Sequence, residues 1–272
     1  IDAAGKNISL GRLRRVTGLF HVSAADAVTA LFVEGVGDLS IGGGTSVTLP
    51  ALRRVCGGGI AMSSPQLESF ELPAFEGGAL SRLYVDFRND RECRFALGQP
   101  PSVIGSATWD GNANGGLYLD VGSALNLSWP HTRMTGGHVS ILRVDTVELG
   151  GVTEVGLSGL TIQSSARRVL LPNLKRFLSL SGLVLHSLTR MTSFELPAFE
   201  GGNLSWLRVD MRDDVDCHFA LGQPPSVIGH PSTDATPWGG LLLDVGPTCN
   251  ATWLSGLVSL GGQLTLRRIA SI

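Results

Sequence analysis

A short run of acidic and amide side chains is the best local candidate for metal chemistry. Asp110, Asn112 and Asn114 alternate with small residues before Gly115, as in the first half of a calcium-binding loop. The bidentate glutamate that closes such a loop at its twelfth position is missing, because Val121 stands there. A turn rich in asparagine and glycine explains the same residues. We therefore expect no metal and no cofactor. If the chain did bind calcium, these three residues would be the candidate ligands.

Carboxylates and histidines are the side chains that general acid–base catalysis would need. A glycosidase or lyase would require at least two carboxylates to converge on one face. Aspartates at a strand end usually cap a turn, and the six histidines have no metal-ligand or catalytic-triad spacing. We therefore predict that the chain is not an enzyme. The carboxylates that recur 124 residues apart are Glu71/Glu195, Glu76/Glu200, Asp86/Asp210, Asp90/Asp214 and Asp120/Asp244.

Sequons and cysteines indicate an oxidising, extracellular compartment. An even number of cysteines suits two disulfides, which persist outside the cytosol. Two tryptophans, Trp129 and Trp253, each follow a sequon directly, and each either stacks on an attached glycan or fills the core. Both alternatives remain open. The sequon asparagines, none followed by proline, are Asn7, Asn126, Asn203 and Asn250, and the cysteines are Cys56, Cys93, Cys217 and Cys249.

The overall composition excludes several classes of protein. Of 272 residues, 43% are hydrophobic and only 16% are charged, which excludes intrinsic disorder. A formal net charge of −2 excludes a basic surface for nucleic acid. No uninterrupted apolar run reaches the roughly 18 residues of a spanning helix. We therefore expect neither a nucleic-acid partner nor a membrane span in this chain.

Two segments of the chain are near copies of each other. Residues 69–105 and 193–229 agree at 29 of 37 positions, at an offset of 124 residues. This offset divides the chain into the end of a preceding repeat at 1–26, a first copy at 27–148 and a second copy at 149–272. We expect both copies to form one continuous solenoid, as a slice of a longer array.

A shorter period inside each copy predicts the fold. The phrase Leu-Pro-x-Leu-x-x-Val, or a relative of it, begins at Leu49, Leu72, Leu149, Leu171 and Leu196. Short alternating apolar stretches follow glycine-containing turns, and no window has the apolar stripe of a helix. We predict an all-β, leucine-rich parallel β-solenoid with coils of 22–25 residues, in which the proline of each phrase marks a corner between strands.

The predicted solenoid limits how the cysteines pair. Cys93 and Cys217 align between the copies, so about five coils at roughly 4.8 Å each would separate them. A disulfide needs Cα atoms within about 7 Å, which excludes this pair. The remaining pairs are Cys56–Cys93 and Cys217–Cys249, each of which would tie an insertion to a coil. Four buried free thiols are the alternative.

The leucine phrases resemble the receptor L domain. That domain is the leucine-rich β-helix of insulin- and growth-factor-receptor ectodomains and of fungal GPI-anchored cell-wall and sporulation proteins. The resemblance is best over residues 45–87 and next best over 167–211, whereas residues 88–116 and 212–240 are insertions that it does not explain. It implies a right-handed β-helix that serves surface recognition, adhesion or wall structure, without enzymatic activity.

We therefore expect a non-enzymatic repeat glycoprotein with a structural or adhesive role in a cell wall, flagellar or cell-surface coat. Near-identical neighbouring copies suit a role in which the number and spacing of units matter. Its partners would be neighbouring repeats or other surface-coat glycoproteins. The alternative is a receptor-like module that binds carbohydrate or protein through the insertions at 88–116 and 212–240. A β-helix enzyme acting on carbohydrate would instead need carboxylates that converge in a groove.

Overall fold

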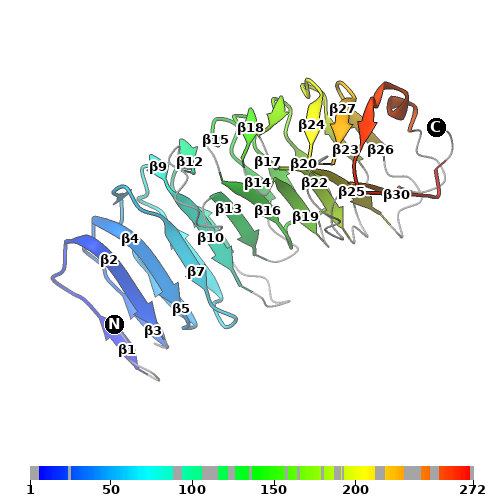
Figure 1. Cartoon of the computed structure of the whole chain (residues 1–272). Helices are drawn as coiled ribbons and strands as arrows, with labels where there is room; N and C mark the ends of the chain where they lie inside the picture. Colours follow the sequence, from blue (N-terminus) through cyan, green and yellow to red (C-terminus); the bar gives the residue numbers. More distant parts are fainter. Residues whose placement is uncertain are drawn as a thin grey trace.

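The chain folds as an elongated, curved stack of parallel strands, with its termini at opposite ends (Figure 1). The computed structural model describes residues 6–23, 26–87, 94–105, 116–121, 126–134, 137–156, 159–163, 166–178, 181–186, 191, 193–211, 218–229, 240–245 and 251–269. Within these residues the only helical segment is a 3-10 turn, η1 (Thr252–Gly256). The predicted all-β parallel solenoid is confirmed.

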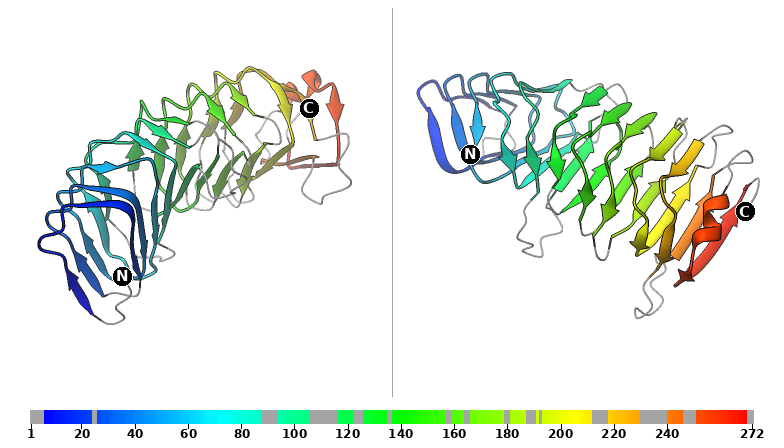
Figure 2. Two further views of the ribbon diagram at one scale, coloured as in Figure 1. Left: turned by 60° about the vertical axis from the view of Figure 1, so that its left-hand side comes forward. Right: turned by 90° about the horizontal axis from the view of Figure 1, so that it is seen from above.

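One sheet runs along the whole stack and receives one strand from each coil (Figure 2). We call it the long sheet and its strands rungs. A short extra strand, β6 (Arg54–Val55), pairs with the second rung. The rungs, in spatial and chain order, are β2 (Arg15–Ser23), β4 (Gly35–Gly42), β7 (Ile60–Ser63), β10 (Arg82–Asp86), β13 (Gly116–Asp120), β16 (His138–Ile141), β19 (Leu160–Gln163), β22 (Leu183–His186), β25 (Trp206–Asp210), β28 (Gly240–Asp244) and β30 (Gln263–Arg267).

Shorter sheets close the other two sides of the coils, again with parallel pairing. The second side holds β1 (Asn7–Ser9), β3 (Ala27–Thr29), β5 (Ser46–Thr48), β8 (Ser69–Leu72) and β11 (Arg94–Leu97), then β14 (Asn126–Ser128), β17 (Thr146–Glu148), β20 (Arg168–Leu170), β23 (Ser193–Leu196) and β26 (His218–Leu221). The third side holds β9 (Ala79–Leu80), β12 (Val103–Ile104), β15 (Arg133–Met134), β18 (Glu154–Val155), β21 (Arg176–Phe177), β24 (Gly202–Leu204), β27 (Pro225–Ile228) and β29 (Ser259–Leu260).

The register of the long sheet gives the length of each coil. Most steps from rung to rung take 19 to 24 residues, near the predicted 22–25, but Leu83 to Leu117 and Leu207 to Leu241 are steps of 34 residues. These two long steps lie five rungs apart. The residues at the same register position are Phe20, Leu39, Ile60, Leu83, Leu117, Val139, Leu160, Leu183, Leu207, Leu241 and Leu264. All are buried except Leu264 of the last rung, which is 53% exposed.

Parts of the two predicted insertions, 88–116 and 212–240, are regular coil, so these parts continue the solenoid. Residues 94–105 contribute β11 and β12, and residues 218–229 contribute β26 and β27. These strands join their sheets because they carry apolar side chains at the inward positions. Phe95, for example, pairs with Phe70 and is 6% exposed.

The core is one column of apolar side chains inside the coils. Aromatic rings stack along it where β8 meets β11 and where β23 meets β26, with 6.1 Å between the ring centroids of Phe70 and Phe95 and of Phe194 and Phe219. Each leucine-phrase proline lies in a turn within two residues of the end of a strand, as Pro73 does directly after β8. The predicted corner position of these prolines is confirmed, because a residue without an N–H costs no ladder bond there.

Candidate functional site

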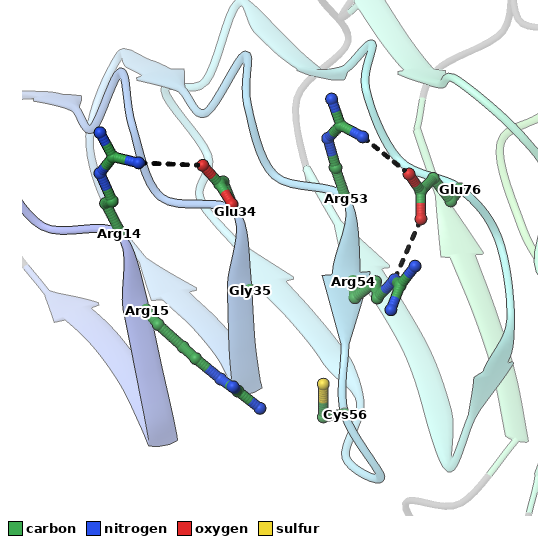
Figure 3. Close-up of a pocket in the computed structure, with 8 residues that line it drawn as sticks. All are labelled: Arg14, Arg15, Glu34, Gly35, Arg53, Arg54, Cys56 and Glu76. Carbon is green, nitrogen blue, oxygen red and sulfur yellow. Dashed lines mark hydrogen bonds and ion pairs between the residues drawn. The ribbon is translucent and has the colours of Figure 1, made fainter.

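Charged side chains gather at one corner of the first four coils (Figure 3). We call this set the arginine–glutamate corner. Backbone bonds stack its members from coil to coil, because the Glu34 N–H donates to the Arg14 carbonyl at 2.8 Å and the Arg53 N–H to the Glu34 carbonyl at 2.9 Å. The corner borders a hollow of about 710 Å³. The lining residues are Arg14, Arg15, Glu34, Gly35, Arg53, Arg54, Cys56 and Glu76.

Positively and negatively charged side chains alternate from coil to coil at the corner. Arg53 and Arg54 both contact Glu76, at 3.2 Å and 3.0 Å (Figure 3). The hydrogen bond from Arg54 lowers the pKa of the Glu76 carboxyl below its ordinary value of 4.5, and Arg53 adds to this effect. Arg15 faces Gly35 across the hollow and has no carboxylate partner among the described residues. Four guanidinium groups against two carboxylates leave the corner positively charged.

The same pairing recurs farther along the solenoid, so it is not confined to one site. Arg176 contacts Glu154, and Lys175 contacts Glu200 at 3.0 Å. All these groups are substantially exposed, so the pairs contribute little to stability. Their alternation prevents like charges from stacking on successive coils, which would be unfavourable.

Four aspartates at the ends of rungs are buried. Asp86 and Asp120 pair across β10 and β13, and Asp210 and Asp244 pair across β25 and β28. An arginine, Arg143, binds Asp120 through its Nε at 2.5 Å, and Arg268 binds Asp244 at the same distance. The four residues are 0–7% exposed. Of the carboxylates that recur 124 residues apart, Asp86 thus lies beside Asp120, and Asp210 lies beside Asp244.

The outward face of the long sheet holds a second hollow, of about 360 Å³. Its floor is made by small residues of β4 and β7, including Ser40, Ala61 and Ser63, and its wall by Arg82 and Tyr84 of β10. The Tyr84 hydroxyl donates to Asp86 at 3.0 Å. The ring of Tyr84 stacks on that of Tyr118 of the next rung, with centroids 4.5 Å apart. Aromatic, cationic and hydroxyl groups therefore converge on one concave surface.

A related arrangement lies on the later rung β25. A Cβ placed on Gly182 would come within 2.7 Å of the Trp206 indole ring, so this ring lies directly over the glycine. Arg208 follows two residues on, and its guanidinium reaches Asp210 only at 3.7 Å. This pairing of Trp206 with Arg208 on the outward face was not predicted from the sequence. The available signal was the exchange of Arg82-Leu-Tyr84 for Trp206-Leu-Arg208 at aligned positions.

The described sequon asparagines are all exposed. Asn7 and Asn126 lie on the second side of the coils, in β1 and β14, and Asn203 lies on the third side, in β24. Asn250 lies outside the described residues. Exposure is what attachment of a glycan requires, and occupancy stays a prediction.

Trp129 is not available to stack on a glycan, which corrects one of the two alternatives for this residue. Its side chain is 5% exposed and packs 6.5 Å from the ring of Phe95. The backbone N–H of Trp129 donates to the Glu148 carbonyl. This bond places Trp129 level with Leu149, the first leucine of the next phrase. Trp129-Pro130 thus replaces Leu-Pro at this corner. The side chain of Trp253 lies outside the described residues.

The remaining predicted sites are tested only in part. Cys56 is exposed and forms no disulfide within the described residues, whereas Cys93, Cys217 and Cys249 lie outside them, so both pairings stay predictions. The calcium candidates Asp110, Asn112 and Asn114 also lie outside them. Within the described part of the chain, no three histidine, cysteine or acidic side chains are grouped to hold a metal ion.

No helix in the described residues has the length and apolar character to cross a bilayer. Comparisons of the chain with family models, curated proteins and solved structures found no match. The structure confirms the fold as a parallel β-solenoid, whereas the specific likeness to the receptor L domain stays a prediction.

Proposed function

We propose that this chain is a non-enzymatic, extracellular repeat glycoprotein with a structural or adhesive role in a cell wall, flagellar or cell-surface coat. The observation that carries the proposal is the uninterrupted ladder of eleven parallel rungs, with one apolar column inside it. Such a stack is an elongated scaffold whose outward faces repeat at regular intervals. The natural partners of such a scaffold are neighbouring repeats or other surface-coat glycoproteins.

The exposed sequons support the extracellular part of the proposal. Asn7, Asn126 and Asn203 all present their side chains to solvent, on two of the three sides of the coil. Glycans on these sides would leave the outward face of the long sheet uncovered.

The proposal is tested on the protein from its native source. Peptide-N-glycosidase treatment followed by intact-mass measurement should remove glycan mass, with Asn126 and Asn250 converted to aspartate. Antibody labelling of intact cells should find the protein at the surface. An unchanged mass, together with labelling only after the cells are made permeable, would overturn the extracellular proposal.

The second candidate function is recognition of carbohydrate or protein by a receptor-like module. The observation that favours it is the hollow walled by Arg82 and Tyr84, which has the size range of a small-ligand site. This surface lies on the long sheet rather than within the insertions at 88–116 and 212–240. Binding of a ligand by the purified chain, lost on substitution of the wall residues, is the result that separates recognition from a purely structural role.

A further inference from the structure

We propose that the outward face of the long sheet carries two saccharide subsites, one on β10 and one on β25, and that each takes a sugar bearing a carboxylate. Each subsite combines an arginine with an aromatic ring: Arg82 with Tyr84, and Trp206 with Arg208. The proposal rests on the proposed extracellular role in one respect, because that role determines where the protein would encounter such a sugar.

The first observation is that both pairs face outward from equivalent rungs. The central residues Leu83 and Leu207 are fully buried, so the residues on either side of each point away from the core. The order of arginine and aromatic residue is reversed between the two rungs, yet each rung keeps one of each. This retained chemistry at exchanged positions distinguishes the pairs from ordinary surface residues.

The second observation is that glycines make room for these side chains. A Cβ on Gly59 would lie 2.3 Å from Cγ of Arg82, and a Cβ on Gly182 would meet the Trp206 ring. Both side chains therefore lie over glycines that adjoin the preceding rung. The partly exposed Trp206 ring on this face can serve as a platform for the C–H face of a pyranose.

The third observation concerns charge. Arg82 has no ion pair or hydrogen bond within the described part of the chain, and the carboxylate nearest in register, Asp38, accepts the Gly59 N–H at 2.7 Å. Among the described residues, Arg208 has only the contact of 3.7 Å to Asp210, and its buried Nε has no hydrogen-bond partner there. A planar guanidinium with free donors is suited to a carboxylate, which it binds with two parallel hydrogen bonds. A neutral sugar would leave this capacity unused.

The hollow beside Tyr84 fits the rest of such a ligand. Its volume of about 360 Å³ and its Ser40 and Ser63 hydroxyls provide space and hydrogen-bonding groups next to the ring and the guanidinium. The two subsites lie five rungs apart, or about 24 Å along the stack at roughly 4.8 Å per rung. One polysaccharide strand running along the face can therefore engage both, which raises its affinity above that of a short oligomer.

The experiment titrates the purified full chain with defined hexasaccharides by isothermal titration calorimetry. One probe is a hexamer of galacturonate, one is a hyaluronan hexamer, and the matched neutral control is the fully methyl-esterified galacturonate hexamer. We expect at least one acidic hexamer to bind, and the ester to bind about tenfold more weakly, because it lacks the charge-assisted hydrogen bonds.

Variants locate the binding. Arg82→Gln combined with Trp206→Ala should weaken binding about tenfold or more, whereas Trp206→Phe should retain it in part. Arg167→Gln, at an exposed arginine on another side of the coil, is the matched control and should leave binding unchanged. Ligand-induced change in tryptophan fluorescence, absent from Trp206→Phe, reports on the second subsite without a truncated side chain.

Three results would overturn the proposal. One is the absence of binding by both acidic hexamers, and another is equal binding of the methyl ester. The third is loss of binding on Arg15→Gln with Arg54→Gln at the arginine–glutamate corner, with no effect of the Arg82 and Trp206 variants. Because these measurements use purified protein, they can fail while the deglycosylation and surface-labelling results stand, and the converse also holds.

Discussion

At the scale of single residues, Trp129 takes the interior position that a leucine occupies in the next coil. Its indole fills the column between the Phe95 ring and the coil of Leu149. The sequon beside it keeps Asn126 on the surface, so the two residues have separate roles.

Truncation of this ring should be costly. Trp129→Ala would leave a cavity in the column and is expected to lower the free energy of unfolding by about 3–5 kcal/mol. Trp129→Leu should cost less, because leucine suits the same position in other coils. Denaturant unfolding followed by circular dichroism measures both. Phe32→Ala, at a side chain that is 50% exposed, is the control, and a loss as large as that of Trp129→Ala would contradict the core assignment.

Glu76 gives the arginine–glutamate corner a dependence on pH. The hydrogen bond from Arg54 lowers its pKa in the folded state below 4.5, so the carboxylate favours folding above the unfolded pKa, and this contribution is lost as the pH falls through the folded pKa. Glu76→Gln should therefore lower Tm slightly at pH 7 and by less at about pH 3.

Thermal unfolding at the two pH values measures this difference. The exposed Glu68, which has no ion pair among the described residues, provides the control Glu68→Gln. A Tm difference between wild type and Glu76→Gln that stays constant from neutral to acid pH would show that the pair does not act through ionisation of Glu76.

At the scale of elements, the corners are as tightly packed as the strands. Gly98 follows β11 and approaches the corner of the coil before it, where a Cβ would lie 2.2 Å from the Pro73 carbonyl oxygen. Gly222 stands in the same relation to Pro197. Glycine is required at these positions because the coils stack backbone on backbone, with no space for a side chain.

Substitution at this corner should push two coils apart. Gly98→Ala is expected to destabilise the fold by about 1–3 kcal/mol, because the carbonyl that the methyl group meets belongs to the backbone and cannot rotate away. Gly11→Ala, where nothing lies within 4 Å of the added Cβ, should be close to neutral. Chemical denaturation of both variants makes the comparison, and equal stability would contradict the close stacking of these corners.

At the scale of the whole molecule, contacts lie mostly between neighbouring coils, so stability is largely a sum of coil and interface terms. Arg268, which donates to the Met211 carbonyl, reaches across two rungs. The long sheet continues across all eleven rungs, and buried apolar side chains of its first ten rungs belong to one column. In the described residues the shorter sheets are interrupted between β11 and β14, between β15 and β18 and between β21 and β24. The long sheet spans all three points, so we expect the coils to unfold together.

A cooperative transition is the expected result. Far-ultraviolet circular dichroism should show β-structure with little helix, and its thermal transition should coincide with that of tryptophan fluorescence. Of the five tryptophans that contribute to this fluorescence, Trp129 lies near the middle of the stack and Trp206 in its second half. Two separated transitions, or a spectrum dominated by helix, would contradict this picture.

The amino-acid sequence by itself determined the parallel solenoid and the corner position of its prolines. Both follow from local properties: apolar residues that alternate with period two, glycine-containing turns, and prolines such as Pro73 directly after a short strand. The near copies at an offset of 124 residues also directed attention to equivalent positions, including the aspartates at rung ends.

The tertiary structure alone decided which outward side chains meet. Contacts between coils depend on register, and the steps of 19 to 34 residues vary with turns whose lengths no local pattern predicts. Only the register places Arg82 over Gly59 and Trp206 over Gly182. It also places Trp129 in the column, because burial there depends on the neighbouring coil rather than on the adjacent sequon.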